Sequence, residues 1–514
     1  MYIRRHIPVI SLVLGNFIIA TWTLLCFFTK PINFDLTGQQ VLLSQWLHGY
    51  MDGSVTAPTN YIAKMLIYAP FYYAPWPAHV SIILMTLLIN VISFTLIFFI
   101  LKRLMIEVGI RVSGYFYVGM LWLAVIAGSV FWIEYANSRN LEVAGGLFLI
   151  LSTIRLMKRS TVKAATGLAL FSGVLFFTDP LQLYMTAVIA VMYAGYMAYK
   201  KRLWRRLGLL LIALVAGYAL SVLIRYGIHY VTNVEFFSVN SFQQSVAIFH
   251  DPIRTGYTTL KANLLLLSGA HDIGRLSQFA NLALIGVSVA LFLLLTLKKR
   301  LPANTAFFIF GGVAVVEGVY VASGQPAFGG DTSRYLVMIA PLFVLVVASM
   351  TYLGKKSSQL YGLIASIVII TNCLLLLGAT LTHWTMQLPA DARLSEAADY
   401  VDQRNTTYAY ASMDTAIPAT YLYRPQGILL PLSCDDQGLR RTYLFYDKGL
   451  FRRADQSVVA EVPIILDGEL ISNSPNICNV AKIVSQLGAP IRQEKAGGST
   501  VLIYSPETLR LRLH

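Results

Sequence analysis

The chain has 514 residues, of which 56% are hydrophobic and only 13% are charged. Because an ordinary soluble domain has roughly a quarter of its residues charged, this composition excludes a soluble globular monomer. The formal net charge of +15 does not indicate nucleic-acid binding, since most Lys and Arg residues form short clusters between apolar runs. Such clusters are typical of membrane proteins, in which positive charge sets the orientation.

Apolar stretches long enough to cross a bilayer recur up to residue 382 and predict an α-helical polytopic membrane protein with about eleven transmembrane helices. They lie near residues 7–29, 79–101, 115–134, 141–157, 163–178, 180–199, 206–224, 279–297, 303–323, 335–353 and 360–382. Arg4 and Arg5 precede the first stretch and imitate a signal peptide, but about 20 apolar residues suffice to span a bilayer. We therefore expect an uncleaved first helix.

Basic residues fall in every second gap between these stretches. They are Arg4 and Arg5; Lys102, Arg103 and Arg111; Lys158, Arg159 and Lys163; Lys200 to Arg206; Lys298 to Arg300; and Lys355 and Lys356. The positive-inside rule makes these gaps cytoplasmic, with the N-terminus inside and the C-terminus outside. The complementary gaps, which hold most polar residues able to do chemistry, are therefore predicted to be extracytoplasmic.

The composition becomes polar after His383 and predicts two domains. Residues 1–384 form a transmembrane module with extracytoplasmic loops at 30–78 and 225–278, the second of which holds an apolar re-entrant or interfacial segment at 262–270. Residues 385–514 form a small extracytoplasmic α/β domain, with a helix at 392–403 and strands at 408–412, 427–430, 443–446, 458–466 and 500–504. Cys434 and Cys478 would lie in an oxidising compartment, so we expect a disulfide that stabilises the domain by about 4 kcal/mol.

Asp35 follows the first predicted helix almost immediately, in the segment NFDLTGQQ at residues 33–40. Its carboxylate is therefore expected near the extracytoplasmic membrane surface. Two interpretations stay open. Asp35 could cap the following helix by accepting backbone amide hydrogens, or it could serve as a catalytic carboxylate.

The second extracytoplasmic loop is short and rich in hydrogen-bonding groups. Glu142 is expected at the start of the next helix, where the helix dipole favours a negative group. That interpretation accounts for Glu142 without a function, but it does not account for Arg139 three residues earlier. Asp179, which precedes Pro180, is a turn former first and a functional carboxylate second.

Three further residues are candidates for substrate binding. Asp331 and Arg334 lie in the segment GGDTSRY at residues 329–335, just before an apolar run. An arginine at an outer helix end can grip a phosphate bidentately, or it can serve as an interfacial anchor. Glu317 lies inside an apolar span near its outer end, where a carboxylate is costly unless it is paired or faces a wet cavity.

With these features together, the sequence resembles the C-type glycosyltransferase (GT-C) superfamily, which includes protein O-mannosyltransferases and aminoarabinose transferases. The resemblance rests on helix number and orientation, an acidic residue soon after the first helix, and two short motifs. The motifs are a Ser-Arg-x-x-acidic pattern at residues 138–142 and Ser-Arg-Tyr-Leu at 333–336 with a later proline. It covers mainly residues 1–382.

The resemblance implies an inverting hexosyl- or pentosyltransferase in the cell membrane, with an extracytoplasmic active site. It would move a sugar from a polyprenyl-phosphate donor to a cell-envelope glycan, glycolipid or protein. Asp35 would be the general base, Glu142 the second acidic residue, and Arg334 a phosphate ligand. Arg139, Glu317 and Asp331 would complete the substrate site. No cofactor is required by these residues; a divalent metal ion is a possible one, although Asp35 has no acidic neighbour before Asp52.

Two other hypotheses fit parts of the pattern. A transporter or flippase of lipid-linked sugars would use the outer carboxylates to gate a cavity, but the chain shows no internal repeat and its polar residues crowd on one face. Alternatively, the C-terminal domain is the functional unit and the helices are an anchor. About eleven spans are far more than an anchor requires.

Overall fold

The computed structural model describes most of the chain, and it divides into two compact units. The described residues are 2–29, 34–50, 53, 55–56, 67, 69–127, 136–180, 182–236, 252–268, 274–322, 336–383, 391–423, 425–435, 438–443, 446–456, 460–466 and 479–512. The first unit, here called the helical unit, consists of Met1–Cys26, Thr86–Ile224 and Ser238–Thr385. The second unit consists of Phe27–Met85, Arg225–Phe237 and Met386–His514.

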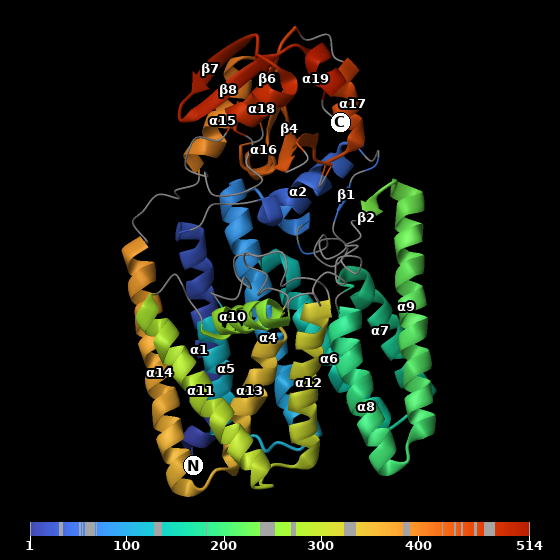
Figure 1. Cartoon of the computed structure of the whole chain (residues 1–514), viewed down its shortest axis with the longest axis vertical. Coiled ribbons are helices and arrows are strands. Elements are labelled where there is room, and N and C mark those ends of the chain that lie inside the picture. The colour runs from blue at the N-terminus through green and yellow to red at the C-terminus, as the bar shows by residue number, and fades with distance from the viewer. Residues whose placement is uncertain are drawn as a thin grey trace. The chain divides into compact units, whose positions relative to one another are not determined.

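Long apolar helices make up the helical unit (Figure 1). Among the described residues, seven helices are long and apolar enough to cross a membrane: α1 (Tyr2–Thr29), α4 (Ala78–Val108), α6 (Ala136–Lys158), α9 (Trp204–Thr232), α11 (Arg275–Leu297), α12 (Ala303–Ala322) and α14 (Lys355–His383). Shorter pieces are α5 (Gly114–Ile126), α7 (Val162–Thr178), the π-helix η2 (Leu183–Ala187) with α8 (Val188–Lys201), and α13 (Ile339–Ala348) with the 3-10 turn η7 (Ser349–Tyr352). The chain is a multi-pass membrane protein.

Where the apolar stretches of the sequence fall on described residues, they lie mostly in helices, while the number of eleven spans stays a prediction. One further helix, α10 (Pro252–Ser268), includes most of the segment expected to be re-entrant or interfacial. Figure 1 shows α10 lying across the direction of α11 and α12 instead of alongside them. A helix in this orientation is suited to an interface, since its apolar stretch is too short to span.

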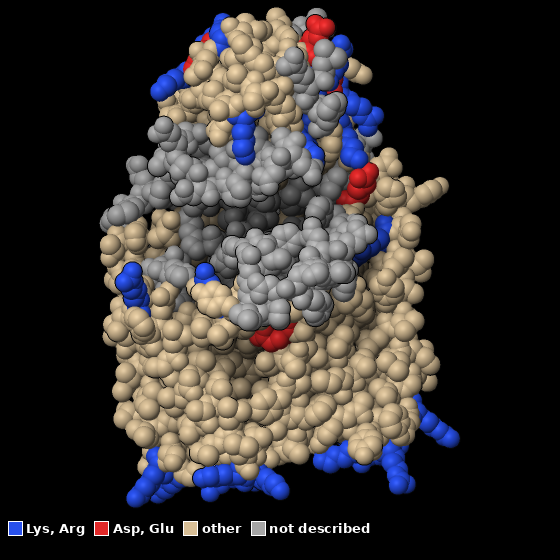
Figure 2. Space-filling view, viewed as in Figure 1, with Lys and Arg blue, Asp and Glu red and all other residues tan. Residues whose placement is uncertain are grey.

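The basic clusters gather at one end of the helical unit, which we call the basic end. Figure 2 shows Lys and Arg side chains along the end at which α1 begins. Contacts between helix ends agree: Lys158 Nζ bonds Glu107 at the end of α4, and Arg206 at the start of α9 donates to the carbonyl of Met157. Lys200 donates to Asn304 at the start of α12. The alternation of charge predicted from sequence is thus present as a single charged face.

The second unit contains a mixed sheet, whose strands follow the order β5-β4-β3-β6-β8-β7 among the described residues. The strands are β3 (Tyr408–Ser412), β4 (Ile428–Asp435), β5 (Gly438–Arg441), β6 (Val462–Leu466), β7 (Arg492–Ala496) and β8 (Ser499–Tyr504). The helices beside them are α15 (Asp391–Gln403), α16 (Met413–Leu422), α17 (Lys448–Gln456), α18 (Val480–Leu487) and α19 (Pro506–Arg512). Strand β3 is parallel to β4 and β6, and the other pairs are antiparallel.

The central strands are the ones that the sequence predicted best. Every side chain of β6 is buried, and so are four of the five in β3, because both faces of a central strand are covered. The strand expected at 443–446 is wrong at the described residues Tyr443 and Tyr446, which are outside any strand. Edge strand β5 forms earlier instead, because it pairs through its backbone with β4 and needs no apolar pattern.

Parts of both long predicted loops belong to the second unit. Helix α2 (Phe34–Leu47) packs against α16 and buries Leu42 completely. Gln45 Oε1 accepts a hydrogen bond of 2.9 Å from the backbone of Asp447. Strands β1 (Val55–Thr56) and β2 (Glu235–Phe236), one from each loop, pair in parallel. The domain boundary at residue 384 stays a prediction, and the unit that contains the α/β sheet includes these loop segments as well.

Candidate functional site

A chain of buried amides lies at the end of the helical unit opposite the basic end. Asn140, near the start of α6, donates from Nδ2 to Asn90 Oδ1 on α4 at 2.6 Å. Asn90 in turn donates to Thr23 Oγ1 on α1 at 3.0 Å, and Thr23 donates to the carbonyl of Ile19. All three side chains are buried. Three helices are therefore held together by polar contacts inside an apolar bundle, where an unsatisfied amide would be costly. We call this end of the helical unit the polar end.

Glu142 follows Asn140 by two residues, in the second turn of α6, and is only 5% exposed. Two glycines follow it on the same helix. A Cβ atom on Gly145 would lie 2.9 Å from Leu175 of α7, and one on Gly146 would overlap Gln182 Oε1. Gly146 is four residues after Glu142 and thus shares its helix face. The small residues allow two neighbouring segments to approach α6 directly below the carboxylate.

A second buried carboxylate ends helix α7. Asp179 is fully buried, and its Oδ2 accepts a hydrogen bond of 3.0 Å from Gln182 Nε2. Gln182 precedes the π-helix η2, and Thr186 within η2 donates to the carbonyl of Gln182. A π-helical turn is rare and occurs most often at functional sites. This turn brings Gln182, the partner of Asp179, against Gly146, which is one turn from Glu142.

Glu317 on α12 is held from the side by the transverse helix α10. Its Oε1 accepts a hydrogen bond of 2.6 Å from Asn263 Nδ2, and Asn263 also donates to the carbonyl of Thr259. The other oxygen, Oε2, is buried and has no hydrogen-bond partner among the described residues. A buried carboxylate oxygen without a partner is costly, so this position favours a hydrogen-bond donor. Helix α12 packs against η2 and α8, which carry the neighbouring part of the site.

An apolar groove lies next to the buried polar residues Asp179 and Gln182. It has a volume of about 550 Å³ and lies between α9 and the segment formed by η2 and α8. Its lining starts at Leu183, the residue after Gln182, and includes Tyr184, Val188, Val191, Met192, Leu211, Leu214, Val215 and Tyr218. Val215 and Tyr218 are more than half exposed. The groove is therefore open to the apolar surroundings of the bundle and suits a hydrocarbon chain.

The structure describes only part of the site predicted from sequence. Glu142 and Glu317 both lie in the helical unit, toward the polar end. Asp35 is in the first turn of α2 and Arg139 in the first turn of α6, but their side chains lie outside the described residues, as do Asp331 and Arg334. Cys434 lies on β4 with its side chain outside the described set, and Cys478 is outside it altogether, so the disulfide stays a prediction. The described residues contain no group of three His, Cys, Asp or Glu side chains that could hold a metal ion.

Sequence reasoning missed Asn90 and Gln182 as members of the cluster. Asn90 lies in the middle of an apolar stretch, and Gln182 lies in a turn whose sequence indicates a role only for Asp179. A signal is present, because an amide within an apolar span is costly and usually faces another polar group. The partner could not be named from sequence, since Asn140 is 50 residues away.

The comparison with solved structures finds matches to this chain, whereas the two comparisons of sequence do not. No protein-family model matches the chain, and no curated protein sequence matches it. The crystal structure of ArnT from Cupriavidus metallidurans bound to undecaprenyl phosphate superimposes with a TM-score of 0.53, covering 96% of this chain and 97% of that one at 11% identity. This chain has the fold of ArnT. The apo form of ArnT gives a TM-score of 0.50 at 9% identity over 95% and 96% of the two chains.

ArnT is an aminoarabinose transferase with the GT-C fold. The resemblance inferred from residues 1–382 is thus confirmed as a likeness of fold, and it extends over nearly the whole chain.

Proposed function

We propose that this protein is a membrane glycosyltransferase that takes a sugar from a polyprenyl-phosphate carrier. The observation that carries the proposal is an ArnT-like fold whose polar end has buried carboxylates directly beside an apolar groove. A ligand with one charged, hydroxyl-rich end and one long hydrocarbon end fits that pairing. A polyprenyl-phosphate sugar is such a molecule.

Each part of the donor has a proposed partner. The hydrocarbon tail lies in the groove between α8 and α9, which is lined almost entirely by apolar side chains. The sugar hydroxyl groups bond Glu142, the Asp179 and Gln182 pair, and Oε2 of Glu317. Arg334 and Arg139 bind the phosphate, because a guanidinium forms two parallel hydrogen bonds to it, and Asp331 accepts a hydrogen bond from a sugar hydroxyl group.

The reaction is a single displacement at the anomeric carbon. An acceptor hydroxyl oxygen forms a bond to that carbon while the bond between the carbon and the phosphate oxygen breaks. The phosphate leaves with the electron pair and remains on its lipid, stabilised by arginine. The hydroxyl proton passes to the Asp35 carboxylate, which acts as general base. Because attack and departure occur on opposite faces, one displacement inverts the anomeric configuration, for a hexose or a pentose alike.

The positive-inside rule supports an extracytoplasmic site, since the basic end would face the cytoplasm. A carrier lipid is a sensible donor there, because nucleotide sugars are made inside the cell. The acceptor would be a hydroxyl group of a cell-envelope glycan, glycolipid or protein. The membrane supplies both the donor and the medium in which its tail moves.

Replacing the proposed base tests this reaction. Asp35→Asn keeps the size of the side chain but removes its basicity, so transfer from a labelled polyprenyl-phosphate sugar should fall at least about 100-fold. Asp399→Asn, at an exposed position on α15, is the matched control and should transfer normally. The wild type and both variants, purified in detergent, should show the same helix content by circular dichroism. Normal transfer by Asp35→Asn would overturn the assignment of the base.

The same preparation separates a transferase from a flippase. Proteoliposomes that hold a labelled lipid-linked sugar should yield a new glycosidic bond when an acceptor glycan is added. Movement of the labelled lipid across the bilayer without any such bond would replace the proposed function with transport.

A further inference from the structure

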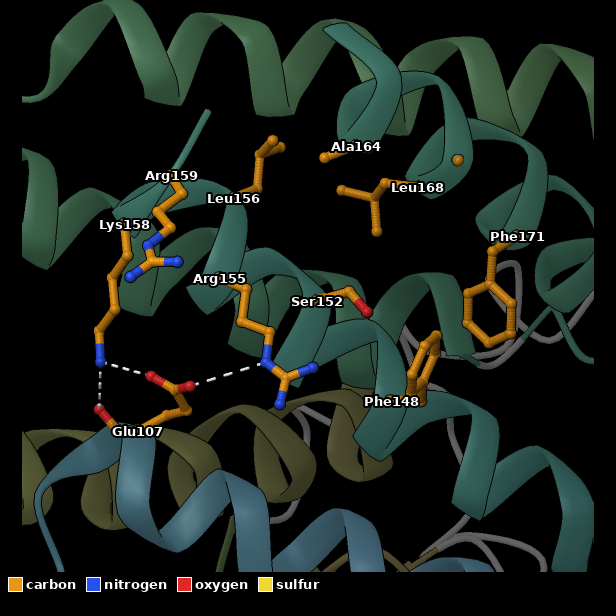
Figure 3. A pocket seen from close by; sticks show the side chains of 11 residues that line it. Glu107, Phe148, Ser152, Arg155, Leu156, Lys158, Arg159, Ala164, Leu168 and Phe171 are labelled. Atoms are coloured by element: carbon orange, nitrogen blue, oxygen red, sulfur yellow. Dashed lines mark hydrogen bonds and ion pairs between the residues drawn. The ribbon is translucent and has the colours of Figure 1, made fainter. Parts of the chain in front are cut away.

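A hollow lies at the basic end of the helical unit, away from the buried polar residues of the polar end. Its volume is about 660 Å³, and it lies among the ends of α4 and α6 and the start of α7 (Figure 3). The lining residues are Glu107, Phe148, Ser152, Arg155, Leu156, Lys158, Arg159, Ala164, Gly167, Leu168 and Phe171. Neither the fold comparison nor the proposed transfer reaction gives this hollow a role.

Two of the three cations of the hollow, Lys158 and Arg155, are held by Glu107. Glu107 binds Lys158 Nζ at 2.5 Å and Arg155 Nε at 3.6 Å, and Lys158 also donates to the Glu107 carbonyl at 3.2 Å. Arg206 donates to the carbonyls of Met157 and Lys158 at 2.8 and 2.6 Å, which secures the last turn of α6. The backbone that carries these cations is therefore anchored from two sides.

The charges do not balance. Three cations, Arg155, Lys158 and Arg159, face one carboxylate, that of Glu107. The Arg159 guanidinium has no hydrogen bond or ion pair with any residue that the structure describes, and Arg155 is half exposed. Two guanidinium groups therefore have donors to spare at one wall of the hollow. Such groups match the oxygens of a phosphate.

The opposite wall is apolar. Phe148 and Phe171 meet edge to face with their ring centroids 5.0 Å apart, and Leu168 lies beside them (Figure 3). Phe148 is 40% exposed, and Leu170 and Val174, farther along α7, are 57% and 48% exposed. The apolar wall thus continues into the hydrocarbon-facing surface of the bundle. A soluble anion would leave this wall unused, whereas an amphiphile would cover it.

We propose that this hollow binds the headgroup of an anionic phospholipid from the leaflet at the basic end, with an acyl chain along Phe148 and Phe171. The phosphate contacts Arg155 and Arg159, and Lys158 extends the positive field. Orientation by positive charge explains why cations are present here, but it requires neither a hollow nor a carboxylate that organises them. Basic pockets between membrane helices on the cytoplasmic side bind lipid headgroups for the same physical reason. The proposal is independent of the transfer reaction at the polar end.

The experiment measures lipid retained by the purified full-length protein in native mass spectrometry. Phosphatidylglycerol and phosphatidylcholine, which carry the same acyl chains, are each titrated into the detergent-solubilised protein. The double variant Arg155→Gln/Arg159→Gln should bind phosphatidylglycerol about thirtyfold more weakly, and Arg159→Gln alone about fivefold more weakly. The single variant breaks no contact with a described residue, so it should fold normally and keeps the test decisive.

A matched variant controls for total charge. Lys298→Gln/Lys299→Gln removes two cations between α11 and α12 at the same end, and neither residue lines the hollow. It should retain phosphatidylglycerol as the wild type does. Equal loss in this control would show diffuse surface attraction and overturn the proposal. So would equal retention of phosphatidylcholine, or full displacement of the lipid by soluble glycerol phosphate, which would assign the hollow to a water-soluble phosphate.

Discussion

The two ends of the helical unit differ in how deeply their charged residues are buried. At the basic end, Lys158, Arg155 and Glu107 are partly exposed, and their ion pairs lie beside an open hollow. At the polar end, Asp179 is fully buried and bonds Gln182, Glu142 is almost fully buried, and a separate chain of amides joins three helices. An exposed ion pair contributes about 1 kcal/mol or less, whereas a buried charge costs several kcal/mol unless it is compensated. The polar end therefore holds the charged residues whose burial must be compensated by their neighbours.

This contrast separates two meanings of a polar residue in a membrane protein. Outside the hollow lined by Arg155 and Arg159, cations at the basic end orient the chain, and the exact side chain that carries each charge matters little. A carboxylate buried at the other end must have compensating groups placed around it, which is the arrangement that a site for a hydroxyl-rich ligand requires. The same substitution should therefore have unequal effects at the two ends.

The largest expected effect is on transfer by Glu142→Gln. On the proposed function, this variant loses the second acidic residue of the site, so transfer should fall at least about 100-fold. Glu107→Gln, the same change at the basic end, should leave the rate of transfer unchanged. The measurement is the initial rate with a labelled polyprenyl-phosphate sugar. Equal rates for the two variants would remove the functional distinction between the ends.

The next effect is on packing at Gly146. In Gly146→Ala the new methyl group runs into Gln182 Oε1 and lies 2.5 Å from Thr186 Cγ2, so helix α6 and η2 must separate. We expect a loss of about 1–3 kcal/mol in the free energy of unfolding. Gly195→Ala on α8 is the control, because nothing lies within 4 Å of the position that its Cβ atom would take and alanine favours a helix. Unfolding in detergent micelles, followed by tryptophan fluorescence, should show destabilisation of the first variant and not of the second.

The amide chain gives a related prediction of similar or smaller size. Asn90→Ala removes the acceptor of Asn140 and the donor to Thr23, so each single alanine variant of Asn90 and Asn140 should lose about 1–3 kcal/mol. The double variant should lose less than the sum of the two, because the same hydrogen bond is removed in each. Strict additivity in a denaturation series would show that these amides do not act together.

The smallest effect is expected for the stability of Glu107→Gln. Its partners Lys158 and Arg155 are 40% and 50% exposed, so losing both ion pairs should change the free energy of unfolding by less than about 1 kcal/mol. The difference from wild type should shrink further in high salt, since salt screens exposed charges. A loss of several kcal/mol would mean that the basic end is as tightly constrained as the polar end.

Much of the fold could be read from local sequence. The apolar stretches found the helices of the helical unit, and the pattern at residues 408–412 found β3 with the bounds that the structure has. Both succeed because burial of apolar residues in lipid or in a central strand depends on the residue itself. Edge strand β5 was missed at Gly438–Arg441, and a strand was expected at Tyr443 instead, because an edge strand is specified mainly by the partner it pairs with.

The candidate site, like the fold, could be predicted only in part from the sequence. Sequence alone indicated Glu142 and Glu317 as carboxylates near helix ends, and it placed the basic clusters on one face, because the cost of a charge in lipid and its preference for one side are properties of single residues. Only the tertiary structure decided that Asn90 joins Asn140, that Gln182 meets Gly146, and that Asn263 holds Glu317. These pairings depend on how each helix is rotated and which neighbour it packs against, and that is set by contacts between residues far apart in the chain.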